Sequence, residues 1–294
     1  MKRCTSNRLV FVAIFVMFLL FGCGNRFQEA SAADRITLTP RAKELTSPDK
    51  AGARMELKIE GVNVAFRWCP PGAFVRHWNK STEDYWERQT TWDDDKEDFE
   101  IKLTKGFWLA ETETTQELWQ AVTGDNPSKG TKARKAPVNY VSWEETQEFI
   151  SKLNAADYAP DGFEFRLPTE AQWEYACMAD TMGERYGELD AIAWYGDNSD
   201  GRLHEVGKKK ANAWGLYDML GNVWEWCEDY YSAYPMGNLT DYVGPQDGSR
   251  RACRSGGWDE DPKYSTATSR NGWSAELVKF ATLGVRLAIV PKER

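Results

Sequence analysis

The sequence predicts an α+β fold with few helices, short strands and many loops. Three segments between residues 114 and 180 begin with a helix-capping pattern and carry apolar residues at helical spacing. Beyond Asp180 the pattern changes to short apolar runs separated by Gly, Asn, Asp and Pro, which is typical of short strands joined by loops. Strands and helices do not alternate along the chain, and no repeat with a solenoid period is present. The segregation of helices from strands therefore favours α+β over a parallel α/β sheet.

Composition places the chain among globular proteins. Apolar residues make up 41% of its 294 residues, and 14 tryptophans predict an aromatic core. The formal charge is −8 at pH 7, and no basic stripe interleaved with aromatic residues is present. An acidic surface repels phosphate backbones, so we expect no nucleic-acid partner.

The N-terminus carries an export signal. Three basic residues precede an apolar run, Leu9 to Phe21, that is too short to span a membrane comfortably. The run leads into Leu20-Phe21-Gly22-Cys23, which resembles a bacterial lipobox, whose cysteine receives diacylglycerol. This pattern predicts a lipid anchor at Cys23 that holds the protein in a bilayer, at the outer membrane or cell surface, facing the periplasm or exterior. The alternative is cleavage after Ala32, and both alternatives predict export.

The expected organisation is a signal peptide over residues 1–22, a tether over 23–54 and a globular domain over 55–294. The tether is rich in Ser, Thr, Pro, Lys and Asp and shows little periodicity. Val62 to Trp68 reads as the first strand, which a Pro-Pro-Gly turn closes. The acidic segment from Trp92 to Glu100 reads as a solvated loop, with a cation site as the alternative.

Three helix starts use the same device, a hydroxyl followed three residues later by an acid or amide. They are Thr114 with Glu117, Ser142 with Glu145, and Thr169 with Gln172. We expect the first helix to stop at Gly124.

Four cysteines remain once Cys4 leaves with the signal and Cys23 takes the lipid. They are Cys69, Cys177, Cys227 and Cys253. In an oxidising compartment they allow three pairings, and the alternative is buried free thiols. No CxxC pattern is present, so a zinc knuckle is not expected.

Six ordered segments resemble the formylglycine-generating enzymes, also called sulfatase-modifying factors. They are Phe107–Thr115, Pro137–Trp143, Phe165–Ala176, Asn212–Trp226, Arg254–Trp258 and Leu283–Arg286. The resemblance covers about residues 55 to 292 and implies a compact, loop-rich domain related to the C-type-lectin fold.

Oxidising members of this family bind copper through two cysteines and convert a cysteine of a sulfatase peptide to formylglycine. Soft thiolates select Cu(I). With Arg270 kept in register, the equivalent positions here are Glu260 and Ser265, and neither residue type binds Cu(I) well. Cys253 lies before the corresponding segment. The usual copper-dependent oxidation is therefore not expected, and whether the chain is an enzyme stays open.

The resemblance also implies a structural calcium ion. The family's ligand positions match Asp218, Gly221, Val223 and Glu225, and oxygen ligands on a tight Gly-Asn turn suit Ca²⁺. The alternative is that both carboxylates are exposed or cap turns.

For the substrate cleft, the resemblance implies Trp224 as an aromatic floor, with Ser265 nearby; the alternative for Trp224 is a packed core residue. Glu260 is a candidate general base if burial raises its pKa, against a solvated acidic loop. An iron site would need both His77 and His204, which lie in unrelated segments.

The functional hypothesis is an exported lipoprotein that binds a peptide or another ligand without forming formylglycine. The alternatives are altered oxidative or acid/base chemistry in the same cleft, and formylglycine formation at an unconventional site.

Overall fold

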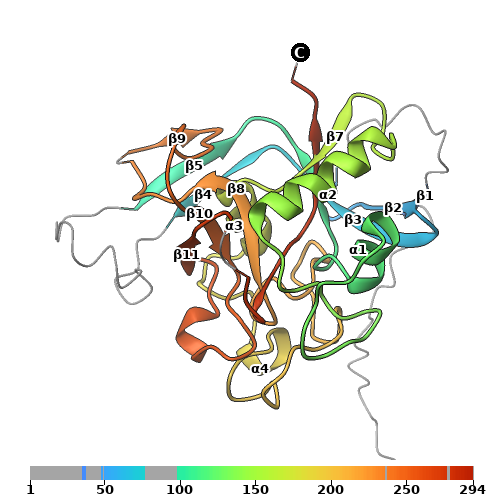
Figure 1. The fold of residues 1–294 in the computed structure, drawn as a ribbon. Coiled ribbons are helices and arrows are strands. Elements are labelled where there is room, and N and C mark those ends of the chain that lie inside the picture. Colours follow the sequence, from blue (N-terminus) through green and yellow to red (C-terminus); the bar gives the residue numbers. More distant parts are fainter. Residues whose placement is uncertain are drawn as a thin grey trace, which may run out of the picture.

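The computed structural model describes residues 35–37, 48, 50–76, 98–235, 237–276 and 279–293. The predicted signal peptide, Cys23, His77 and most of the acidic segment lie outside these residues. The described part holds three sheets and four helices, joined by long irregular segments (Figure 1). This architecture confirms the predicted loop-rich α+β class.

The largest sheet brings together the two ends of the domain. Its strand order is β1-β2-β3-β6-β13-β7, so the C-terminal strand lies between two strands that come more than 100 residues earlier in the chain. The strands are β1 (Arg35–Thr37), β2 (Arg54–Ile59), β3 (Val62–Cys69), β6 (Phe107–Ala110), β13 (Ala288–Pro291) and β7 (Phe163–Arg166). β1 runs parallel to β2, and the other neighbours are antiparallel.

Two smaller sheets complete the strand structure. One has the order β11-β10-β8-β12, with β11 (Arg270–Trp273), β10 (Arg251–Arg254), β8 (Trp224–Tyr230) and β12 (Leu283–Gly284). The other has the order β4-β5-β9, with β4 (Gly72–Arg76), β5 (Phe99–Leu103) and β9 (Leu239–Thr240). The predicted acidic loop therefore ends in strand at Phe99.

Two segments that precede Met55 contact the domain. Residues 35–37 pair with the edge strand β2, because an open sheet edge offers unpaired backbone groups to any neighbouring extended segment. The N–H of Gly52 donates to the carbonyl of Trp68 at 2.9 Å, so packing against the domain begins before Met55.

Two of the three predicted helix starts are confirmed. Ser142 caps α2 (Trp143–Ala155) and Thr169 caps α3 (Glu170–Met178), each in a complete capping box. The cap of α1 (Gln116–Thr123) is Thr115, one residue later than predicted, whereas the end at Gly124 is confirmed by its left-handed φ of 88°. The backbone N–H of Thr114 instead donates to the carbonyl of Val285, so tertiary pairing sets the register. A short α4 covers Leu189–Ile192.

Helices and sheets enclose two aromatic cores. α1 and α2 pack together beside the large sheet, while α3 packs on β8 and β10 (Figure 1). Among the largest fully buried side chains are Trp68, Trp108, Trp173 and Trp226. Within the described part of the chain, no helix has the length and apolar character needed to cross a bilayer.

Candidate functional site

The loop between β10 and β11 carries Glu260 and Ser265, the two positions that the resemblance equates with copper ligands. It leaves β10 through Ser255 and Gly256, whose φ angles are 100° and 96°. A Cβ at position 256 would lie 3.1 Å from the carbonyl oxygen of Tyr264, so the close approach of two loop segments requires glycine there. Asp261 then caps a short 3₁₀ turn, Pro262–Tyr264, that leads to Ser265.

The two copper-equivalent residues have different surroundings. Ser265 is fully buried and its hydroxyl has no hydrogen-bond partner. Glu260 is half-buried, and its Oε1 accepts a hydrogen bond from Trp224 Nε1 at 3.2 Å. Burial raises the pKa of the Glu260 carboxyl, and the charges of Asp259 and Asp261 raise it further. Neither residue offers the soft ligand that Cu(I) requires, so the copper site of the relatives does not fit this chain.

Trp224 lies in the interior behind other aromatic rings. Its side chain is 2% exposed, and its ring meets Trp273 edge-on at a centroid distance of 5.6 Å. Trp224 and Ser265, which we expected to line a cleft, are therefore both covered and present no surface to a ligand. Trp224 is packed in the core, which was the alternative to a role in the cleft floor.

An aromatic surface covers Trp224, and sequence reasoning missed it. Trp273 is half-buried and contacts Phe280 at 5.5 Å between centroids, and Phe280 is 44% exposed. Trp258 is half-buried and donates through Nε1 to the carbonyl of Ala281, the residue after Phe280. We call Trp258, Glu260, Trp273 and Phe280 the aromatic–acidic face. A signal was present in the sequence, since Trp258 and Trp273 stand among polar residues that give them no helical or strand stripe.

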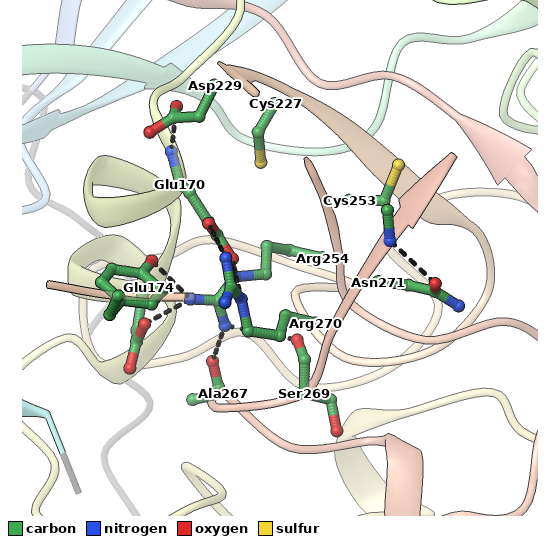
Figure 2. A network of polar contacts seen from close by, with 12 residues as sticks. Glu170, Glu174, Cys227, Asp229, Cys253, Arg254, Ala267, Ser269, Arg270 and Asn271 are labelled. Atoms are coloured by element: carbon green, nitrogen blue, oxygen red, sulfur yellow. Dashed lines mark hydrogen bonds and ion pairs between the residues drawn. The ribbon is translucent and has the colours of Figure 1, made fainter. Parts of the chain in front are cut away.

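All four described cysteines are buried and free. Cys227 on β8 and Cys253 on β10 pack into different core clusters. Figure 2 shows both thiols near the network described below. Burial raises the pKa of all four thiols, so the thiolate form that binds metals is disfavoured. The four described thiols are therefore buried, unpaired by disulfides and disfavoured as thiolates.

The predicted calcium turn exists. Gly221 and Asn222 have φ angles of 80° and 61°, and a Cβ at Gly221 would lie 2.2 Å from the carbonyl oxygen of Trp194. Asp218 is buried, with Oδ2 accepting from the N–H of Gly207 at 2.6 Å and Oδ1 without a partner. Burial raises the pKa of Asp218 to about 6.

One of the predicted calcium ligands, Glu225, is already engaged by other side chains. Its Oε1 accepts from Arg286 Nη2 at 2.8 Å and Nε at 3.0 Å, and its Oε2 accepts from Arg286 Nε at 2.9 Å and Trp173 Nε1 at 2.6 Å. Glu225 and Arg286 are fully buried. The Arg286 guanidinium therefore provides a counter-charge for the Glu225 carboxylate. Among the described residues, no group of three or more His, Cys, Asp or Glu side chains is arranged to hold a metal.

A second buried network ties α3 to the sheet that carries the candidate site (Figure 2). Glu170 accepts from Arg254 Nε at 2.8 Å and from Arg270 Nε and Nη2 at 2.7 Å each, and Glu174 accepts from Arg254 Nη2. Burial opposes ionisation of Glu170, but Arg270 and Arg254 outweigh it and lower its pKa to about 2. At the edge of the network, burial raises the pKa of Asp229 to about 8.

This network also anchors the loop of the candidate site. Arg254 Nη1 donates to the carbonyls of Ala267 at 2.7 Å and Ser269 at 3.2 Å. Sequence reasoning did not find the network, although Glu170 and Glu174 stand one helical turn apart in α3 and so share a face. Arg254 therefore holds the end of the loop that carries Glu260.

His204 has a packing role in the structure. Its ring stacks on Trp194 at 3.7 Å between centroids, and its Nε2 lies 2.7 Å from the carbonyl oxygen of Ser199.

Comparison with known proteins identifies the family. The sulfatase-modifying factor enzyme 1-like domain matches residues 68–290. The chain is 29% identical to a protein of Paenibacillus barcinonensis named chaperone protein LppX, over 52% of this chain and 69% of that protein. It is 33% identical to the formylglycine-generating enzyme of Streptomyces coelicolor over 42% of each, and so spans less than half of that enzyme.

A solved structure extends the likeness to nearly the whole described domain. Treponema denticola variable protein 1 superposes with a TM-score of 0.71 at 30% identity, covering 81% of this chain and 99% of that one. The family match spans well over half of the sequence and includes Glu260 and Ser265. The chain therefore belongs to the sulfatase-modifying factor enzyme 1-like family.

Proposed function

We propose that this chain is an exported, lipid-anchored member of the family that binds a peptide through the aromatic–acidic face and does not form formylglycine. The observation that carries the proposal is the pair of residues at positions 260 and 265, a carboxylate and a buried hydroxyl. These groups cannot replace two thiolates at Cu(I), but one of them, Glu260, borders an aromatic surface.

The aromatic rings support binding in place of oxidation. Trp273 is braced by Trp224 at 5.6 Å and by Trp226 at 6.3 Å between centroids, both edge-on, so its position is fixed before a ligand arrives. Rigid aromatic side chains supply contact area with little loss of conformational entropy, which makes them frequent binding hot spots. A partly exposed Phe280 beside Trp273 adds apolar area to the face.

A peptide-selection experiment tests the binding half of the proposal. Random peptides displayed on phage are selected on the purified full-length protein, on Phe280→Ala and on Val243→Ala. Val243 is a matched control because its side chain is 51% exposed, against 44% for Phe280, and lies outside the face. We expect the wild type and Val243→Ala to enrich the same peptides and Phe280→Ala to lose them. Equal enrichment on all three proteins would contradict the proposal.

A chemical experiment tests the other half. The protein is incubated with a Cys-x-Pro-x-Arg peptide, copper and oxygen, and the product is analysed for aldehyde by mass spectrometry. We expect unchanged peptide. An aldehyde product would refute the claim that formylglycine is not formed.

The membrane anchor rests on the sequence around Cys23. Metabolic labelling with a radioactive fatty acid in the host should mark the wild type and not Cys23→Ser. If the label persists in Cys23→Ser, the anchor is elsewhere or the assignment is mistaken.

A second candidate function, acid/base catalysis, has one observation in its favour. Burial raises the pKa of Glu260, as a general base acting near neutral pH requires. Selected peptides that the wild type converts to a product of different mass, and that Glu260→Gln binds but leaves unchanged, would favour this function over binding alone.

A further inference from the structure

We propose that the aromatic–acidic face selects peptides through a lysine or arginine side chain, whose cationic group pairs with Glu260 between the rings of Trp258 and Trp273. This inference rests on the proposed binding function and adds the chemical class of the ligand. The residue that carries the inference is Glu260, which occupies a position that the family resemblance equates with a copper-binding cysteine.

The Glu260 carboxylate is held in place and still has an oxygen to offer. Trp224 Nε1 donates to Oε1 at 3.2 Å, and the N–H of Gly196 donates to the Glu260 carbonyl at 2.9 Å, so side chain and backbone are both fixed. Within the described part of the chain, no donor is placed on Oε2. A half-buried carboxylate with one oxygen engaged and one unpaired is prepared for a charged donor.

The loop's own cation does not neutralise Glu260. Lys263 pairs with Asp261, at 3.6 Å between Nζ and Oδ2, and both side chains of this pair are about half exposed. Asp259 adds a further negative charge on the other side of Glu260 and is exposed. The loop itself carries three acids against one base, while the Arg185 guanidinium is hydrogen-bonded to its carbonyls at Pro262 and Ser265. The negative charge is therefore concentrated at residues 259–261, where it attracts cationic groups and repels anionic ones.

The surrounding rings favour the same class of ligand. A cation over the face of an aromatic ring gains about 0.5–1 kcal/mol at an exposed site and about 2 kcal/mol when it is shielded from water. Trp258 and Trp273 are both half-buried, so neither residue is sealed in the core. The long aliphatic stem of lysine or arginine can at the same time cover Phe280.

Burial of Glu260 makes a neutral or anionic ligand unfavourable. Desolvation already raises the pKa of this carboxyl, with Trp224 and Lys263 opposing the shift and Asp259 and Asp261 adding to it. An apolar ligand would complete the desolvation without supplying a positive charge, whereas an ammonium or guanidinium group compensates it.

The peptide selection tests this inference through the composition of the binders. We compare the fraction of lysine and arginine among peptides enriched on the wild type, on Glu260→Gln and on Asp125→Asn, an exposed acid far along the chain from the face. Glu260→Gln keeps the size of the side chain and an acceptor for Trp224, so it should fold normally. We expect a basic excess on the wild type and Asp125→Asn and its loss on Glu260→Gln.

Affinity for one enriched peptide gives the magnitude. Calorimetry on that peptide should show about a tenfold or larger loss of affinity for Glu260→Gln, and a similar loss when its basic residue is replaced by methionine. Peptides that depend on Phe280 but show no basic excess would overturn this inference and leave the binding function standing. If no peptide is enriched on the wild type, both proposals fail.

Discussion

Replacing Arg286 by methionine should remove a large part of the protein's stability. Arg286 and Glu225 are both fully buried, and the guanidinium also donates to the carbonyls of Ala110 at 2.9 Å and Tyr217 at 2.8 Å. Methionine fills much of the space but leaves the Glu225 carboxylate without its counter-charge. Breaking a buried pair in this way costs about 3–5 kcal/mol. Since a domain is typically stable by about 5–15 kcal/mol, this loss is a substantial fraction of the total.

Urea unfolding followed by tryptophan fluorescence measures the effect. The matched control is Arg134→Met, which removes an arginine whose side chain is 82% exposed and whose partner, Glu117, is 23% exposed. We expect the control to unfold at the wild-type midpoint. The double variant Arg286→Met/Glu225→Gln removes both charges and keeps an acceptor for Trp173, so it should lose less than the two single variants together. If Arg286→Met unfolds at the same urea midpoint as the control, the buried pair of Arg286 and Glu225 does not stabilise the fold as argued.

Three further predictions concern pH, backbone and metal. Asp229 has a folded pKa of about 8, above its unfolded value, so it binds its proton more tightly in the folded state. The stability of the wild type should therefore fall relative to Asp229→Asn by on the order of 1 kcal/mol per pH unit between about pH 5 and 8. Thermal melts across that range measure this difference, with Asp125→Asn as a control that should show no such trend, and parallel pH profiles for wild type and Asp229→Asn would count against the prediction. Gly221→Ala should destabilise the protein by more than Gly61→Ala. Both glycines have φ near 80°, but only at Gly221 would the new Cβ meet a backbone atom, at 2.2 Å. Equal melting temperatures for the two variants would exclude this backbone clash as the cause. Millimolar calcium should leave the melting temperature unchanged, because Glu225 is engaged by Arg286, and a rise with calcium concentration would show that the ion binds.

Local signals in the sequence located the regular elements. The capping boxes at Ser142 and Thr169 involve residues three positions apart, and local geometry alone decides such contacts. At α1 the sequence offers two adjacent threonines, and the choice of Thr115 follows from a backbone bond between Thr114 and Val285, far away in the chain. Register at such a point depends on tertiary contacts, which local patterns do not encode.

The sequence was sufficient to predict where the candidate site lies, but not which of its side chains are exposed. The register of the family segments placed Glu260 and Ser265 where copper ligands would lie, and the structure keeps both in one loop. Whether Trp224 is open or covered depends on Trp273, which lies on β11, 49 residues further along the chain, and packs against the Trp224 ring. The engagement of Glu225 by Arg286, 61 residues away, likewise appears only when the chain is folded.

Copper affinity tests the central claim most directly. Cu(I) is titrated into the reduced, full-length protein in the presence of a coloured Cu(I) chelator, anaerobically, with Cys253→Ser as a parallel sample. Because the expected ligand positions hold a carboxylate and a hydroxyl, and the thiols are buried and protonated, we predict that the chelator keeps the copper in both samples. One equivalent of Cu(I) withdrawn from the chelator by the wild type, and released by the cysteine substitution, would contradict the account.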